Sequence, residues 1–272
     1  MQSSERFKKV ITDSVSEGLI PGAVVAAFEL KTEGAVVAAF DGQRRLTPSP
    51  LSMEWETVFD WASLTKVLCT TPLIWRLIER GWLTESTPVC AVLQDAPRAW
   101  NKITIGHLLS HSAGFRAWAP VWQKLQAKWG DQIVEVPIAV RQREVRAQVM
   151  SEGLEVEPGS RTLYSDFSFL LLGFVIEELF SSPMDAVWAR EIGAPSGGHA
   201  GFRRCRSSQQ QSDTRVAATE DVSWRGGVLQ GQVHDENCWS MGGYAGHAGL
   251  FGSMMDLILV TRRVFDSNFL SA

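Results

Sequence analysis

The chain has few cysteines, no excess of positive charge and no long apolar run, and each shortage excludes a class of protein. Its four cysteines show no C-x-x-C spacing, which argues against a zinc knuckle and against a disulfide framework. The formal net charge is -4 at pH 7, and no dense cluster of Lys and Arg indicates a nucleic-acid partner. Because no run of about 18 apolar residues occurs, we expect no membrane partner either.

The N-terminal residues also lack the apolar core of a secretory signal, so we expect a cytoplasmic protein with reduced cysteines. The basic stretch RQREVR at residues 141–146 predicts a solvated helix face rather than a nucleic-acid footprint. Eleven tryptophans are many for 272 residues. They favour core and interface packing, with an aromatic-lined pocket as the alternative.

What the chain does contain is enough apolar material for a substantial core, since 45% of its residues are hydrophobic. The pattern ERFKKVITDSVSEG predicts an amphipathic helix that ends at Gly18. Residues 21–30 and 35–42 predict two strands, and KTEG at 31–34 predicts the turn between them. The N-terminal region is therefore expected to form a helix followed by a β-hairpin.

The remaining patterns predict helices for the most part. Apolar helices are predicted at 63–81, with Gly81 as the stop, and at 165–180. Residues 102–115 predict a short helix ended by Gly114, residues 194–213 a loop, and residues 241–253 a glycine-rich turn or short strand before another helix. Strands and helices do not alternate, which argues against a parallel sheet.

These patterns predict an α+β fold: an antiparallel sheet flanked by helices, together with a large, mainly helical region. We expect one module over residues 1–272. Residues 1–60 would supply the helix and hairpin of the sheet region, and residues 61–272 the helical region with the candidate nucleophile.

The segment DWASLTKVL contains a serine and a lysine, Ser63 and Lys66, in the first turn of a predicted buried helix. Free backbone N–H groups at a helix N-terminus can stabilise a developing oxyanion. A lysine three residues further on lies on the same face and can reach the serine oxygen. An apolar setting disfavours the charged form of the lysine, so Lys66 is a candidate activator of Ser63.

A second proton-handling group follows about a hundred residues later, in the sequence LYSDFSF. Tyr164 stands on a turn before an apolar helix, from which a side chain can project into a cleft, and Asp166 follows it two positions on. An ordinary turn tyrosine is the alternative interpretation. An isolated S-x-x-K or Y-x-D would prove nothing, since both patterns arise by chance.

Four longer strings occur in order: FDWASLTKV, ITIGHLLSHSAGF, EPGSRTLYSDFSFLLLGFVIEELF and GYAGHAGLFGSMMDL. Together they resemble the class C β-lactamase, DD-peptidase and serine-esterase family from about residue 5 to about residue 265. The resemblance implies a β-lactamase/transpeptidase-like fold. It also implies a serine nucleophile at Ser63, its lysine at Lys66 and a general-base partner at Tyr164, with no cofactor and no metal.

The chain departs from the family pattern at two places. Asp166 stands where the family usually has Asn; it can accept a hydrogen bond from Lys66, but it lacks the amide donor that would bind a substrate carbonyl. The family's third motif, K-T-G or H-x-G on a late strand, has no clear match, because GHAGLFGS precedes a predicted helix and KTEG lies in the hairpin turn. We therefore expect that the chain lacks the C-terminal part and that the sheet is incomplete, so that its open edge favours self-association.

Several other residues are weaker candidates. His247 either contacts the substrate or is an ordinary turn residue. His107 and His111 have the spacing of a metal-binding H-E-x-x-H helix but lack its glutamate, so packing roles are favoured. The run His234-Asp235-Glu236 favours a loop near the cleft over a cation site, and Ser112 does not satisfy the G-x-S-x-G pattern of α/β-hydrolases.

The sequence thus predicts a serine hydrolase that acts through an acyl-enzyme on a small-molecule ester, amide or β-lactam. Ser63, Lys66 and Tyr164 would be catalytic, and Asp166 and His247 would bind substrate. The alternative is an inactive or truncated family member with a binding or regulatory role.

Overall fold

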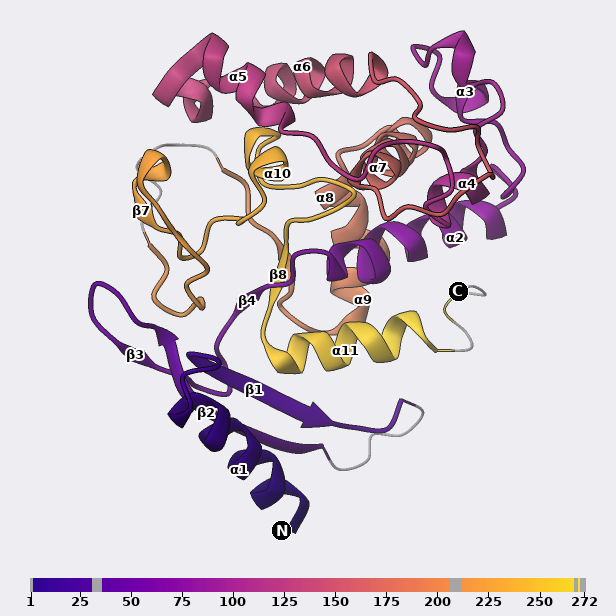
Figure 1. The fold of residues 1–272 in the computed structure, drawn as a ribbon. Coiled ribbons are helices and arrows are strands. Elements are labelled where there is room, and N and C mark those ends of the chain that lie inside the picture. The colour runs from indigo at the N-terminus through magenta and orange to yellow at the C-terminus, as the bar shows by residue number, and fades with distance from the viewer. Residues whose placement is uncertain (1, 31–35, 206–211, 267–268, 270–272) are drawn as a thin grey trace.

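The computed structural model describes residues 2–30, 36–205, 212–266 and 269. Figure 1 shows a sheet layer with its helix near the N-terminus and a larger helical region on the other side of the molecule. The two parts meet where β4, β8 and α11 lie between them. The predicted α+β class is confirmed, with antiparallel pairing in every named sheet of the described residues.

The sheet layer forms as the sequence predicts. The helix α1 (Gln2–Ser16) is followed by the strands β1 (Gly22–Ala27), β2 (Val37–Arg45) and β3 (Leu51–Ser52). The order is β1-β2-β3, and Val24 pairs with Phe40 in an antiparallel register. The predicted KTEG turn lies outside the described residues. In the described part of the chain β1 pairs with β2 alone, so its other edge is open.

The segment after the short strand β4 (Phe59–Asp60) does not form one regular helix from Ser63. A π-helical stretch, η1 (Lys66–Thr70), precedes the α-helix α2 (Thr71–Glu79). Pro72 has no N–H to donate to the carbonyl of Leu68 four residues earlier. The indole of Trp188 donates to that carbonyl instead, at 3.4 Å. The proline therefore explains why the helix widens at this point.

The helical region packs around α7 (Asp166–Phe180), which is buried at ten consecutive positions from Phe167 to Ile176. Its neighbours along the chain are α3 (Val89–Val92), η2 (Arg98–Trp100), α4 (Ile105–Leu109), α5 (Val121–Trp129), η3 (Gly130–Glu135), α6 (Ile138–Met150), α8 (Met184–Trp188), η4 (Ala189–Gly193) and α9 (Ala194–Ser196). The predicted helix at 165–180 is confirmed. The predicted helix at 102–115 is shorter than expected and ends before Gly114.

Short strands connect the helical region to the site. They are β5 (Gly201–Phe202), β6 (Asp221–Val222), β7 (Gly227–Val228) and β8 (Leu250–Gly252), with η5 (Ser223–Arg225) before β7. The helices α10 (Glu236–Ser240) and α11 (Met254–Val264) flank β8 in sequence. The strand order β4-β8-β5 sets β8 beside the segment that leads to Ser63. The predicted loop at 194–213 contains α9 and β5 in its described part.

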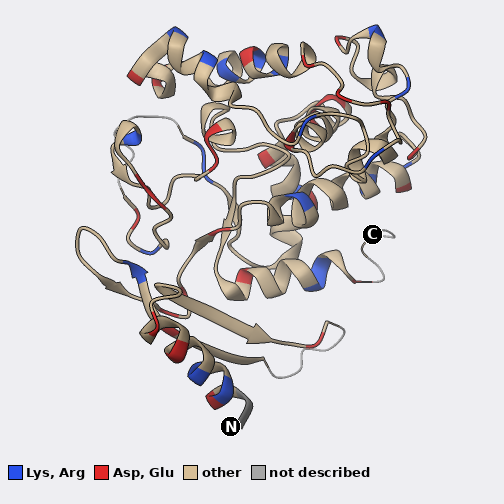
Figure 2. Cartoon of the chain, in the orientation of Figure 1, with Lys and Arg blue, Asp and Glu red and all other residues tan. Residues whose placement is uncertain are grey.

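The prediction of a solvated face for residues 141–146 is wrong at its first residue. Figure 2 shows both signs of charge along α5 and α6, but Arg141 is fully buried. Its guanidinium donates to the carbonyls of Val136, Trp239 and Cys205 at 3.0, 3.4 and 2.7 Å. Burial lowers the pKa of Arg141. These three carbonyls satisfy a buried cation that helical periodicity alone does not distinguish from a surface residue.

The other global expectations concern cysteines and membrane segments. All four cysteines are free thiols, and three of them are buried. Within the described residues, no single helix combines the length and apolar character of a membrane span. The bent pair formed by α7 and residues 184–196 passes that test only when its two helices are taken together, at 74° to each other. The buried residues of α7 show that this helix is a core element of the fold.

Candidate active site

Ser63 lies in the turn between β4 and η1, and its neighbours hold that turn firmly. Ala62 has a φ of 45°, an uncommon value for a residue with a Cβ, and its N–H donates to Asp60 Oδ1 at 2.9 Å. The Trp61 N–H donates to the Leu250 carbonyl at 2.8 Å, which links the turn to β8. The turn therefore presents Ser63 at the beginning of the helical segment.

Lys66 is the best-anchored residue of the site. Only 2% of Lys66 is exposed, and its Nζ lies 3.0 Å from Ser63 Oγ. The same Nζ lies 2.8 Å from Asp166 Oδ1 and 3.1 Å from the carbonyl oxygen of His247. The structure thus brings together four of the five predicted site residues around one ammonium group.

Tyr164 completes the predicted set. Its ring centroid lies 4.8 Å from Lys66 Nζ and 4.6 Å from the imidazole of His111, and 52% of the residue is exposed. The Nδ1 atom of His111 accepts from the Ser165 N–H at 3.1 Å. Burial lowers the pKa of His111, and the charge of Lys66 lowers it further. His111 therefore supports the tyrosine turn, while His107 serves in the N-terminal cap of α4, so neither forms the H-E-x-x-H site.

Asp166 is the first residue of α7, and its carboxylate faces Lys66. Its N–H donates to the Ala117 carbonyl at 2.9 Å, which ties the start of α7 to the loop after α4. A carboxylate in the first turn of a helix is favoured by the helix dipole. Asp166 is therefore held by both the helix and the ammonium.

His247 does not lie on the surface of a glycine turn, because only 1% of it is exposed. Its Nε2 lies 2.8 Å from Asp235 Oδ1, and Nδ1 has no hydrogen-bond partner among the described residues. Asp235 is also the N-cap of α10, where Oδ1 accepts from the Cys238 N–H at 2.7 Å. The backbone of His247, rather than its ring, contacts Lys66.

The sequence analysis missed Asp60, and it placed Asp235 in a loop near the cleft without a role at the site. Burial opposes ionisation of Asp235, but the charge and hydrogen bond of His247 outweigh it and lower its pKa to about 2. Asp60 accepts from the N–H groups of Ala62 and His234, and burial raises its pKa. The N-cap pattern of VHDEN before a short helix was the available signal for Asp235.

Three of these side chains could in principle hold a metal ion. Ligand atoms of Asp166, Asp235 and His247 lie within 4.8 Å of one another, and carboxylate and imidazole ligands together suit zinc. The ammonium of Lys66 already occupies the neighbourhood of Asp166 at 2.8 Å. A cation at this cluster would have to displace that ammonium, so the donor set is better matched to the lysine.

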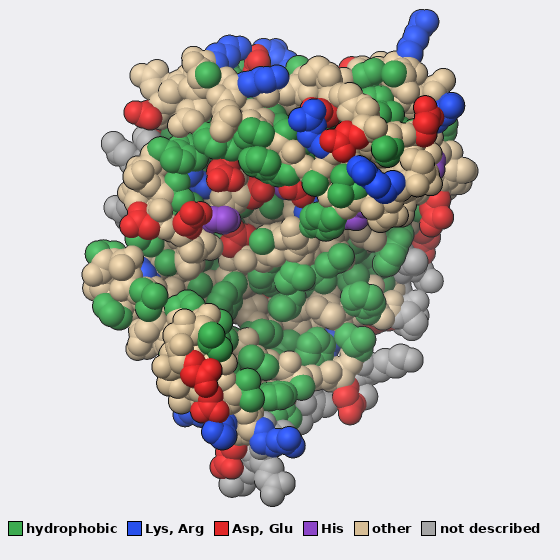
Figure 3. Space-filling model, viewed as in Figure 1, with side chains coloured by type: hydrophobic (Ala, Val, Ile, Leu, Met, Phe, Trp, Pro, Cys, Tyr) green, Lys and Arg blue, Asp and Glu red, His purple; other side chains and the backbone are tan. Residues whose placement is uncertain are grey.

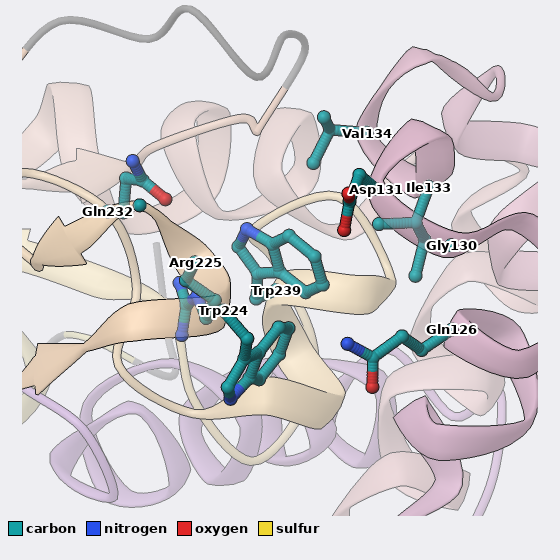
Figure 4. Close-up of a pocket in the computed structure, with 10 residues that line it drawn as sticks. Gln126, Gly130, Asp131, Ile133, Val134, Trp224, Arg225, Gln232 and Trp239 are labelled. Carbon is teal, nitrogen blue, oxygen red and sulfur yellow. The ribbon is translucent and has the colours of Figure 1, made fainter.

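An aromatic pocket of about 160 Å³ lies between the η3 region and α10. Figure 4 shows the rings of Trp224 and Trp239 facing Asp131 and Gln126 across it. The ring of Trp224 stacks on Trp122 at 4.6 Å, and its centroid lies 5.4 Å from that of Trp239. The tryptophans therefore supply both core packing and a pocket wall, as the two sequence interpretations allowed.

The fold and the site together define a class. An exposed serine bonded to a buried lysine at the start of a helix, beside an antiparallel strand and a tyrosine turn, occurs here within an α+β fold of the β-lactamase/transpeptidase type. The chain belongs to the Beta-lactamase family, whose family model matches residues 7–272. The family predicted from the four sequence strings is confirmed.

The relatives include proteins named for amide hydrolysis. A Salmonella typhimurium protein whose name proposes D-alanyl-D-alanine carboxypeptidase activity is 28% identical over 240 residues, covering 81% of this chain and 54% of that protein. The chain therefore spans about half the length of the curated relatives it matches. The octameric penicillin-binding protein homologue from Pyrococcus abyssi has a TM-score of 0.72 at 21% identity, with 98% of this chain and 59% of that one covered. The D-amino acid amidase from Ochrobactrum anthropi SV3 has a TM-score of 0.70 at 17% identity, with 99% and 73% covered.

Proposed function

We propose that this chain carries the acylation site of a serine hydrolase that acts on a small-molecule ester or amide. Ser63 Oγ attacks the carbonyl carbon, the leaving group departs, and water later hydrolyses the acyl-enzyme. The observation that supports this most directly is the 3.0 Å contact between Ser63 Oγ and the buried Nζ of Lys66. An exposed lysine in a capping turn would not be held in this way.

Lys66 meets three acceptors, which match the three hydrogens of an ammonium group. In this arrangement Lys66 donates to Ser63 Oγ and leaves an oxygen lone pair in place. The serine hydrogen must then pass to another group during attack. Tyr164, whose ring lies 4.8 Å from Nζ, is the proposed acceptor: it takes the proton as a phenolate that the Lys66 ammonium stabilises, and it then gives that proton to the leaving group.

The backbone N–H of Ser63 is the proposed donor to the oxyanion. It precedes the first helical turn, where N–H groups have no partner within the helix. Donors fixed in advance at the site of developing charge typically contribute about 3 kcal/mol of transition-state stabilisation. The hydrogen bonds of Ala62 and Trp61 hold this segment in place.

An ester or other acyl substrate is preferred to an amide that needs side-chain recognition. The Asp166 carboxylate is committed to Lys66 and offers no N–H donor to a substrate carbonyl. The Salmonella relative named for carboxypeptidase activity and the D-amino acid amidase extend the candidate substrates to small amides of amino acids. In this proposal His247 shapes the site wall through its backbone.

The first test is intact-protein mass after incubation with a fluorophosphonate, and separately with a penicillin. In the fluorophosphonate reaction the Ser63 Oγ–P bond forms while the P–F bond breaks, and the serine proton leaves with fluoride. We expect one adduct on the wild-type chain, none on Ser63→Ala, and full labelling of Ser112→Ala as the matched serine control. An unlabelled but folded wild-type chain contradicts the proposed function and favours the alternative of an inactive binding or regulatory protein.

We further propose that the chain self-associates through the open edge of β1. Figure 3 shows hydrophobic side chains on the face between the β1–β2 sheet and α11. A hollow of about 300 Å³ lies there, lined in part by Val24, Trp61 and Leu257. The octameric Pyrococcus abyssi homologue shows that a protein of this fold can assemble. Light scattering that finds a monomer at all concentrations would contradict this proposal.

The proposed compartment is the cytoplasm. All four cysteines are free, which suits a reducing environment.

A further inference from the structure

We propose that Asp235 and His247 form a positioning pair that fixes the ammonium of Lys66, and this inference rests on the proposed function. Neither side chain is expected to touch the substrate. The pair acts through the carbonyl of His247, which lies 3.1 Å from Lys66 Nζ. A carbonyl can hold the ammonium only if its own direction is fixed.

The glycines near His247 would not fix that direction by themselves. Glycines flank this segment at Gly246 and Gly249, and Gly249 has a φ of 117°. Glycine lacks a Cβ and so tolerates many backbone conformations. The carbonyls of Gly246 and Ala248 accept from Thr70 Oγ1 and Cys238 Sγ, and the imidazole restrains His247 itself, because it is buried and its Nε2 is bonded to Asp235.

Asp235 is itself fixed by the fold. Its Oδ1 caps α10 through the Cys238 N–H, and its low pKa keeps it ionised at neutral pH. The imidazole Nε2 must therefore carry the hydrogen and donate it to this carboxylate. The remaining ring atom, Nδ1, has no partner among the described residues, so the bond to Asp235 is the one that orients the ring.

The charges around the pair link it to the nucleophile. The charge of Lys66 helps to lower the pKa of Asp235, and this coupling is reciprocal, so the Asp235 carboxylate also stabilises the ammonium. Asp60 faces the pair from β4, Asp166 from α7 and Arg225 from η5. Lys66 thus has one direct carboxylate partner and a second one that acts through His247.

Asp235→Asn separates the charge of the pair from its capping role. Asparagine is as good an N-cap as aspartate, so α10 keeps its acceptor while His247 loses its anionic partner. Glu220→Gln is a matched control, because Glu220 Oε2 lies 2.7 Å from His234 Nε2 in an exposed pair that does not contact Lys66. Both changes replace a carboxylate that faces an imidazole with an amide.

Two further variants test the ring. His247→Ala removes the anchor, and His247→Gln restores a donor near the position of Nε2. We expect Asp235→Asn and His247→Ala to slow fluorophosphonate labelling of Ser63 by about tenfold or more and to shift its pH profile. His247→Gln should recover part of the labelling rate. Glu220→Gln should match the wild type in both the labelling rate and its pH profile.

A second measurement does not depend on activity. Two-dimensional ¹H–¹⁵N NMR of the imidazoles should show His247 as the Nε2–H tautomer in the wild type, with the signal identified by its loss in His247→Gln. Asp235→Asn should alter that tautomer signature, while Glu220→Gln leaves it unchanged.

The outcomes distinguish the two proposals. If the wild-type chain is labelled but Asp235→Asn keeps its rate, pH profile and His247 tautomer, the positioning pair is wrong and the proposed function stands. If the wild-type chain is not labelled, the proposed function fails. The state of the His247 ring then decides the pair separately, since a ring without a hydrogen on Nε2 would overturn it.

Discussion

The ammonium of Lys66 lies 2.8 Å from the carboxylate of Asp166 in a site where only 3% of the lysine side chain is exposed. A nearly buried ion pair of this kind stabilises the charged lysine. Asp166 stands at the position where the family pattern usually has Asn. The departure therefore affects the proton-transfer groups directly.

Asp166→Asn should change how acylation depends on pH. The amide still accepts from Lys66 but removes the negative charge, so the midpoint of the labelling rate is expected to move to lower pH. The variant also gains a donor for a substrate carbonyl, and amide hydrolysis should increase relative to ester hydrolysis. Stopped-flow or mass-resolved labelling between pH 5 and 9 measures the first effect. An unchanged midpoint would show that Asp166 does not influence the proton acceptor.

Tyr164→Phe should reduce the rate of labelling by about a hundredfold without loss of stability. The ring remains against Lys66 and His111, and only the hydroxyl is lost. The chain has two tyrosines, so Tyr244→Phe is the natural control. Tyr244 is buried, with 3% of the residue exposed, and it should tolerate the change with full labelling. Equal rates for the two variants would remove Tyr164 from the mechanism.

Gly246→Ala should destabilise the fold by about 3 kcal/mol or more. A Cβ at Gly246 would lie 1.9 Å from the Phe169 carbonyl oxygen on α7, a backbone atom that cannot move aside cheaply. The carbonyl of Gly246 also accepts from Thr70 Oγ1 at 2.6 Å. Gly201→Ala is the control, since its Cβ would meet no atom within 4 Å. Urea denaturation compares the two, and equal midpoints would contradict the close packing of this turn.

The stability of the chain should fall at acid pH partly through Asp235. Its folded pKa of about 2 lies below the ordinary aspartate value of 3.8, so the stabilisation is present above pH 3.8 and is lost as the pH falls toward 2. The difference corresponds to about 2 kcal/mol at neutral pH. Urea midpoints at pH 6 and pH 3 should therefore differ less in Asp235→Asn than in the wild type. Asp131→Asn, at an exposed position, should keep the wild-type difference.

Local patterns were enough to predict most elements and the family. The α1 helix, the β1–β2 pair and the apolar α7 can be predicted from short stretches of sequence. Each element packs apolar side chains, and these recur in the sequence in a pattern typical of that element. The spacing of Ser63 and Lys66 within one helical turn predicts their contact for the same reason. These features depend on residues that are near one another in the chain.

The sequence by itself determined the α+β class, the Ser63–Lys66 contact and the candidacy of Tyr164. Only the tertiary structure decided that Arg141 is buried, that Asp166 pairs with Lys66, and that the carbonyl of His247 receives the ammonium while its ring binds Asp235. These contacts join segments up to 181 residues apart in the chain. Local periodicity does not specify such long-range contacts. They depend on how β8, α7 and α10 pack around the buried ammonium of Lys66, which needs all of its hydrogen bonds satisfied.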